Sequence, residues 1–186
     1  MLRKIPNILT IGRILIVPFF VLAFYLPGFY GDLTALILFI VASFTDFLDG
    51  MLARMLGEES KLGELLDPIA DKILIVFVFF GLAVSLSSYL IGFFAALIIT
   101  REIWVGALRD LNARNNKSDA TKVTFLAKIK TTIQLFTISI YLIALTLNNM
   151  LLIVVADIFL FVSLFITLYT GIVYTINSFK DTDSLK

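Results

Sequence analysis

The sequence predicts an all-α, polytopic membrane protein with six transmembrane helices and a short interfacial segment at the N-terminus. Hydrophobic residues make up 60% of the 186 residues, and 18 of them are Phe, whereas only about half of a soluble domain is apolar. Apolar segments of about 20 residues, the length that crosses a bilayer as a helix, recur along the whole chain. Lipid must therefore be the solvent for much of the surface.

The N-terminal half of the chain contains the first three expected spans of one membrane-embedded domain, residues 1–186. The amphipathic start, MLRKIPNILT, is expected to lie along the membrane interface ahead of the first span. That span, Asn7–Pro27, carries no charge apart from Arg13, and a very short connection at Gly28–Asp32 follows it. The second and third spans, Leu33–Arg54 and Gly63–Leu86, meet at a longer, charged connection that contains carboxylates.

Three further spans complete the expected bundle. The fourth, Tyr89–Leu111, follows the short connection Ser87–Ser88. A longer, charged connection leads to the fifth, Val123–Leu147, and the sixth, Leu151–Phe179, is the longest. Long and short connections therefore alternate, as expected for helices that cross the membrane back and forth.

The charges predict the orientation and restrict the chemistry. None of the 15 Lys and Arg residues lies in an expected outward loop, so both termini and the charged ends should be cytoplasmic, at an inner (cytoplasmic) membrane. The net charge of +1 gives no reason to expect nucleic-acid binding. Because the chain has no Cys and no His, any bound metal must be held by oxygen ligands.

Four aspartates at the inner ends of the second and third spans predict a metal site. Asp46 and Asp49 are spaced i, i+3 and Asp67 and Asp71 are spaced i, i+4, so each pair shares one helix face. A charge within a membrane helix costs about 2.5–3.5 kcal/mol on insertion scales. Like charges this close require cations between them, and two divalent ions would serve. The simpler alternative is that the aspartates cap helices and pair with Arg54, Lys61 and Lys72.

Cations lie at the same depth as these aspartates. Counting about 1.5 Å per residue from the outer helix ends places Arg13, Arg101, Arg109, Lys128 and Lys130 about 18–30 Å deep. Their simpler interpretation is snorkelling to the interface, which suffices for Arg114, Lys117 and Lys122. For the deeper set, carboxylates with metals on one side and fixed cations on the other predict a pocket for two phosphate-bearing substrates.

The spacing Asp46-x2-Asp49-Gly50-x2-Ala53-Arg54-x8-Gly63-x3-Asp67-x3-Asp71 resembles the signature of the CDP-alcohol phosphotransferase family. Eight fixed positions over 26 residues match without a departure. The segments PNILTIGR, REIWVGALR and KIKTTIQ are similar to stretches of family members that use glycerol 3-phosphate as acceptor. Trp104 departs from that likeness, since a smaller residue is expected there.

The resemblance implies a division of roles among these residues. Two divalent ions, Mg²⁺ with Mn²⁺ as an alternative, would be held against the diphosphate of CDP-diacylglycerol by Asp46, Asp49, Asp67 and Asp71. Asp71 would also be the general base. Residues implied on the nucleotide side are Asp46, Gly50, Ala53, Arg54, Gly63, Thr10 and Arg13. Those implied for the phosphate of glycerol 3-phosphate are Arg101, Arg109, Lys128 and Lys130. A homodimer is also implied.

Other functions remain open on the sequence. The same chemistry could use inositol phosphate, serine or a phospholipid as acceptor, although serine would not need the phosphate-binding cations. A prenyltransferase would carry two separate Asp motifs on more spans. A small ion or solute transporter would explain intramembrane aspartates but not the glycine and alanine positions. No role is assigned to Asp157, and Glu102 could simply pair with a cation.

Overall fold

The computed structural model describes residues 5–56, 61–115, 118–121 and 124–180. Six long α-helices account for nearly all of this part of the chain, which confirms the all-α prediction. Their bounds are α1 Ile5–Ala23, α2 Phe29–Leu56, α3 Lys61–Ser85, α4 Tyr89–Arg114, α5 Phe125–Thr146 and α6 Met150–Lys180, with a short 3₁₀ turn, η2, at Ser118–Thr121. From Ile5 onward the expected interfacial segment is continuous with α1, and residues 1–4 lie outside the described residues.

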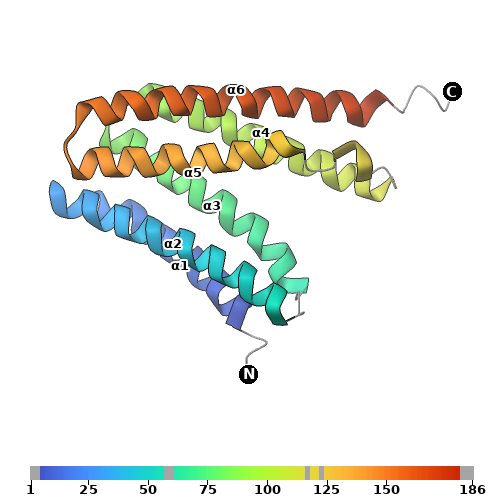
Figure 1. The fold of residues 1–186 in the computed structure, drawn as a ribbon, viewed down its shortest axis with the longest axis horizontal. Helices are drawn as coiled ribbons and strands as arrows, with labels where there is room; N and C mark the ends of the chain where they lie inside the picture. Colours follow the sequence, from blue (N-terminus) through green and yellow to red (C-terminus); the bar gives the residue numbers. More distant parts are fainter. Residues whose placement is uncertain (1–4, 57–60, 116–117, 122–123, 181–186) are drawn as a thin grey trace.

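The helices run back and forth along one bundle (Figure 1). The short connections lie together at the left end of this view, and the C-terminal ends of α2, α4 and α6 lie toward the right. Helix α1 packs against α2 and α3, α4 packs against α3 and α6, and α5 packs against α2 and α6. Helix α3 therefore joins an α1–α2 pair to an α4–α5–α6 group, and the site lies where these parts meet.

Helix ends follow the chemistry of the short connections. Ser87 and Asn148 adopt left-handed backbone angles, with φ of 47° and 49°, and the Ser88 and Asn149 side chains accept hydrogen bonds from the first turns of α4 and α6. Helix α1 ends at Ala23 rather than at Pro27 as the sequence predicted, and the next three residues form tight turns in which each N–H donates to the carbonyl three residues earlier. The chain then turns through Gly28, where φ is +53°.

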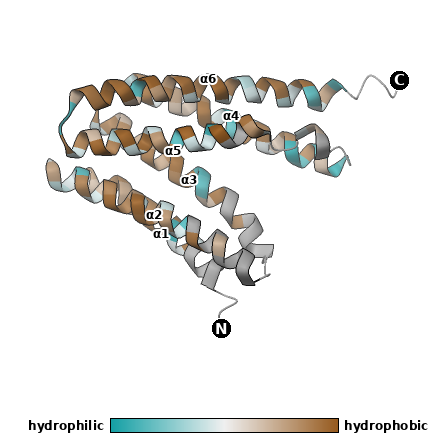
Figure 2. Cartoon of the chain, in the orientation of Figure 1, coloured by the Kyte–Doolittle hydropathy of each residue, from teal (hydrophilic) through white to brown (hydrophobic). Residues whose placement is uncertain are grey.

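Hydrophobic side chains fill the core and also cover the outside. Figure 2 shows apolar residues along most of the coloured part of each helix, with hydrophilic ones toward the right-hand ends of α4 and α6. The core includes Phe20, Phe79, Ile98 and Leu160, each almost fully buried. Many large apolar side chains are instead exposed, among them Phe165 at 70%. Exposed apolar area costs about 25 cal/mol per Å² in water, so this exterior requires lipid.

Four described helices contain stretches long and apolar enough to cross a membrane. They are Phe29–Asp46, Tyr89–Arg114, Ile129–Thr146 and Met150–Lys180, and α1 adds a shorter apolar stretch, Thr10–Ala23. Within the described residues, no stretch of this kind is found in α3. Together these helices make the chain a polytopic membrane protein.

The structure also explains Asp157, to which the sequence assigned no role. Asp157 accepts a hydrogen bond of 2.5 Å from the hydroxyl of Tyr141, whose side chain is fully buried between the helices. A buried hydroxyl needs such a partner. The pair therefore joins α5 to α6 and lies apart from the site described below.

Candidate active site

An arginine from α1 joins carboxylates from α2 and α3. Arg13 is 1% exposed, and its Nη1 donates to Oδ1 of Asp46 and, at 2.9 Å, to Oδ1 of Asp71. Because α1 packs against both neighbouring helices, one side chain reaches both partners. Sequence spacing predicted that these two aspartates lie at one level. The structure brings them together and adds the arginine between them.

The two carboxylates keep an open side despite this pairing. The side chains of Asp46 and Asp71 are 49% and 55% exposed. Both carboxylates share the Arg13 guanidinium. A buried arginine is stabilised by such pairing, while about half of each carboxylate side chain stays accessible on its exposed side. This arrangement suits a cationic ligand.

The remaining motif residues lie on the same helices. Asp49 follows Asp46 within continuous helix α2, and Asp67 precedes Asp71 within continuous helix α3. Their side chains lie outside the described residues, as do those expected on the nucleotide side: Gly50, Ala53, Arg54 and Gly63. The four-aspartate cluster therefore stays a prediction. Where side chains are described, no group of three metal-binding residues is found.

The described donors fit a divalent ion. Two oxygens within hydrogen-bond reach of one nitrogen lie within about 6 Å of each other, so Asp46 and Asp71 present convergent oxygens from two helices. Carboxylate oxygens are the ligands that Mg²⁺ prefers, and about half of each of these two side chains is exposed and can be reached by an ion. Thr10, one turn before Arg13 on α1, is also buried at this level.

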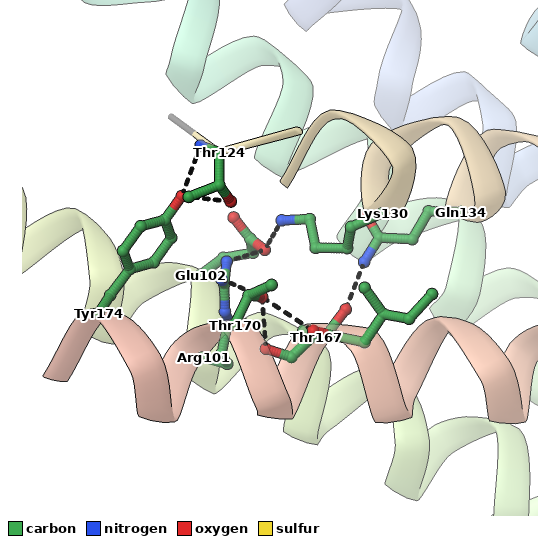
Figure 3. A network of polar contacts seen from close by, with 9 residues as sticks. Arg101, Glu102, Thr124, Lys130, Gln134, Thr167, Thr170 and Tyr174 are labelled. Atoms are coloured by element: carbon green, nitrogen blue, oxygen red, sulfur yellow. Dashed lines mark hydrogen bonds and ion pairs between the residues drawn. The ribbon is translucent and has the colours of Figure 1, made fainter. Parts of the chain in front are cut away.

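A second charged cluster lies between α4, α5 and α6 (Figure 3). Glu102 accepts a hydrogen bond of 3.0 Å from Arg101 and forms an ion pair with Lys130. Arg101 also donates to Thr170 Oγ1 on α6 at 2.6 Å. Both cations are almost completely buried, so their shared carboxylate compensates for much of their desolvation. Glu102, which the sequence allowed only as a possible cation partner, is the centre of this cluster.

Tyr174 separates two of the predicted acceptor-site arginines. The Arg101 and Arg109 guanidinium carbons each lie 5.8 Å from the centre of the Tyr174 ring, within the range of cation–π attraction. The Tyr174 hydroxyl accepts a hydrogen bond of 3.1 Å from the backbone N–H of Thr124, just before α5. Figure 3 shows this tyrosine reaching from α6 toward Thr124. Sequence reasoning missed Tyr174 because it lies uncharged within an apolar span.

A cavity joins the two clusters. It has a volume of about 320 Å³ and lies between α3, α4 and α5, at the lower end of the range for small-molecule sites. Its charged lining consists of Asp71, Lys72, Glu102, Arg109 and Lys130, and much of the remaining wall is apolar. A general-base candidate and phosphate-binding candidates therefore face the same space.

The predicted acceptor cations divide into three groups. Arg109 and Lys130 line the cavity with Asp71. Arg101 instead lies behind Glu102, against Gly171 of α6, and the Lys128 side chain lies outside the described residues. Lys72, which the sequence considered only as an ion-pair partner, also lines the cavity.

Comparison with known proteins identifies the family of this chain. A model of the CDP-alcohol phosphatidyltransferase family matches residues 3–173. Proteins named CDP-diacylglycerol–glycerol-3-phosphate 3-phosphatidyltransferase from Escherichia coli K12 and Shigella flexneri serotype 5b are each 39% identical to the chain over 132 residues. These alignments cover 71% of the chain and 72% of each relative. The chain thus belongs to the CDP-alcohol phosphatidyltransferase family and is a membrane-embedded phosphatidyltransferase.

Proposed function

We propose that the protein transfers the phosphatidyl group of CDP-diacylglycerol to glycerol 3-phosphate, forming phosphatidylglycerol phosphate and releasing CMP. The observation that carries this proposal is that Asp71 and the cations Arg109 and Lys130 line the same cavity. An acceptor with both a hydroxyl and a phosphate would meet a base and an anion site in one space. The names of the two relatives contain the same donor, CDP-diacylglycerol, and the same acceptor, glycerol 3-phosphate.

In this reaction Asp71 is the general base. Its half-exposed carboxylate takes the proton of the acceptor hydroxyl, the hydroxyl oxygen forms a bond to the phosphatidyl phosphorus, and the bond from that phosphorus to the CMP oxygen breaks. Arg13 holds one Asp71 oxygen at 2.9 Å, which orients the carboxylate. Orientation of this kind removes part of the entropic barrier to reaction.

The metal ligands would be Asp46, Asp49, Asp67 and Asp71. Two divalent ions, Mg²⁺ or alternatively Mn²⁺, would polarise the donor diphosphate and stabilise charge on the leaving group. The exposed carboxylates of Asp46 and Asp71 support this proposal.

The nucleotide would lie beside the same helices. Gly50, Ala53 and Gly63 are proposed to allow close approach of CDP to the backbone, with Arg54 beside its phosphates and Thr10 on the α1 side. Arg13 contributes by holding the carboxylates, since both of its described ion pairs are to them.

The acceptor phosphate would contact Arg109 and Lys130, which line the cavity. Arg101 is proposed to act through Glu102, because it pairs with that carboxylate away from the cavity. Lys128 remains a candidate for direct contact. A small phosphate monoester suits the cavity-lining cations, since fixed charged donors bind phosphate strongly.

Orientation and assembly complete the proposal. The proposed site residues belong to the helices that the charged connections join, and the positive-inside rule supports a cytoplasmic location for the site and for both termini, at an inner membrane. A homodimer is proposed from the family resemblance.

CMP release from CDP-diacylglycerol tests the function. The purified protein with Mg²⁺ in detergent is given glycerol 3-phosphate, inositol phosphate or serine in parallel. Release is expected with glycerol 3-phosphate and should be lost on chelation and in Asp71→Asn. Asp110→Asn is the matched control, because Asp110 is exposed and does not line the cavity. Release with inositol phosphate alone would replace the proposed acceptor, and no release from folded protein would overturn the proposal.

A further inference from the structure

Lys72 occupies a position that neither the motif nor the comparisons assign. It follows Asp71 on α3 and lines the same cavity as Arg109 and Lys130. On the facing helix, Glu102, Gly106 and Arg109 are spaced i, i+4, i+7 and so form one stripe along α4. A Cβ atom at Gly106 would lie 3.4 Å from the Lys72 Nζ. The ammonium group therefore lies against the middle of this stripe, where glycine leaves room for it.

The described residues offer this ammonium group no carboxylate of its own. No ion pair of Lys72 is found among them, whereas Asp71 pairs with Arg13, and Glu102 pairs with Arg101 and Lys130. Lys72 and Arg109 therefore add positive charge to a cavity whose two described carboxylates are already paired. A cation removed from bulk water is stabilised by a negatively charged partner. A phosphate monoester, which carries about −1.5 to −2 charges at neutral pH, would be such a partner.

We propose that Lys72 binds the phosphate of the acceptor, opposite Arg109 and Lys130, and so places the acceptor hydroxyl at Asp71. This inference rests on the proposed function for the identity of the acceptor. Lys72 and Asp71 line the same cavity, so a phosphate held by the lysine can leave the rest of a three-carbon acceptor beside the carboxylate. The residue is thus a binding and positioning residue for the acceptor.

Amine footprinting tests this contact without relying on catalysis. The unmodified protein is acetylated in detergent with glycerol 3-phosphate, inorganic phosphate or glycerol present, and the labelling of each lysine is read by mass spectrometry. At about ten times the half-saturating concentration, either phosphate compound should slow labelling of Lys72 by about tenfold. Labelling of Lys180, at the end of α6, should not change, and glycerol should protect neither residue. Equal labelling of Lys72 with and without the phosphate compounds would overturn the inference.

Kinetics supply the second test. Lys72→Met should raise the KM for glycerol 3-phosphate by about tenfold or more, the effect of losing a charge-assisted hydrogen bond. The KM for CDP-diacylglycerol should be unchanged. Lys72→Arg should keep part of the affinity because it keeps the charge, and Lys180→Met is the matched control. A fall in kcat with an unchanged acceptor KM would overturn the inference. If none of the phosphate-bearing acceptors supported CMP release by the unmodified protein, the proposed function would fail. Protection of Lys72 by inorganic phosphate would then still test whether this residue binds phosphate.

Discussion

Replacing Arg13 by methionine tests whether this residue holds the carboxylate site together. Methionine fills much of the buried volume of the arginine but donates no hydrogen bond. Asp46 and Asp71 would then face each other without the cation that now lies between them. Their repulsion should loosen the contact of α1 with α2 and α3 and so lower the free energy of unfolding.

The size of this loss follows from the burial of the partners. Breaking a fully buried ion pair costs about 3–5 kcal/mol, whereas an exposed pair contributes about 0–1 kcal/mol. Arg13 is buried but both carboxylates are about half exposed, so an intermediate cost of about 2 kcal/mol is expected. For a domain of this length each kcal/mol shifts Tm by about 2–4 °C. Arg13→Met should therefore unfold about 4–8 °C below the unmodified protein when divalent ions are chelated.

Circular dichroism during heating measures this difference, with exposed Arg114→Met as the control. Adding Mg²⁺ should reduce the difference in Tm between the variant and the unmodified protein, because without the arginine the carboxylates bind a divalent ion more strongly. A variant that unfolds at the unmodified temperature in chelator would refute the structural role of Arg13. A difference in Tm that grows with Mg²⁺ would contradict the proposal that these carboxylates are metal ligands.

Two further predictions concern α6. Tyr174→Leu removes the ring between Arg101 and Arg109 and should raise the KM for the acceptor by about three- to tenfold. Tyr174→Phe keeps the ring, so its KM should stay close to that of the unmodified protein. Equal KM values for the two variants would exclude the ring contact. Gly171→Ala brings a Cβ within 2.9 Å of Arg101 Cγ and should cost about 1–3 kcal/mol of stability, measured by thermal unfolding. Gly12→Ala is its control, since no heavy atom lies within 4 Å there, and equal stability of the two alanine variants would contradict this packing.

Helices and their order could be predicted because hydrophobic length is a local property of the sequence. The facing levels of Asp46 and Asp71 also followed, since two antiparallel helices of known length place residues counted from their outer ends at matching depths. Depth does not determine the direction of a side chain around its helix. Arg13 was accordingly predicted at the correct level, but its bonds to both aspartates required the packing of α1.

The second cluster was less predictable for a physical reason. Lys130 and Arg101 stand out as charges in apolar spans, yet the sequence does not say which carboxylate compensates them. Thr170, Gly171 and Tyr174 belong to α6 and carry no charge, so their apolar surroundings hide them. Their roles depend on the contact of α6 with α4, which only tertiary structure reveals.

The division of the charges between the two clusters bears on how one cavity could serve the proposed base and the proposed anion site. A lone carboxylate beside free arginines and lysines would turn toward them across the cavity and away from the acceptor hydroxyl. Here Arg13 holds Asp71 from the α1 side, and Glu102 occupies Arg101 and Lys130 from the α4 side. Each helix group thus compensates part of its own charge before substrate arrives, and Lys72 and Arg109 leave positive charge in the cavity for the substrate. Asp71 and the cavity-lining cations can then face the same space without collapsing onto each other, which is the condition that base catalysis next to a phosphate site requires.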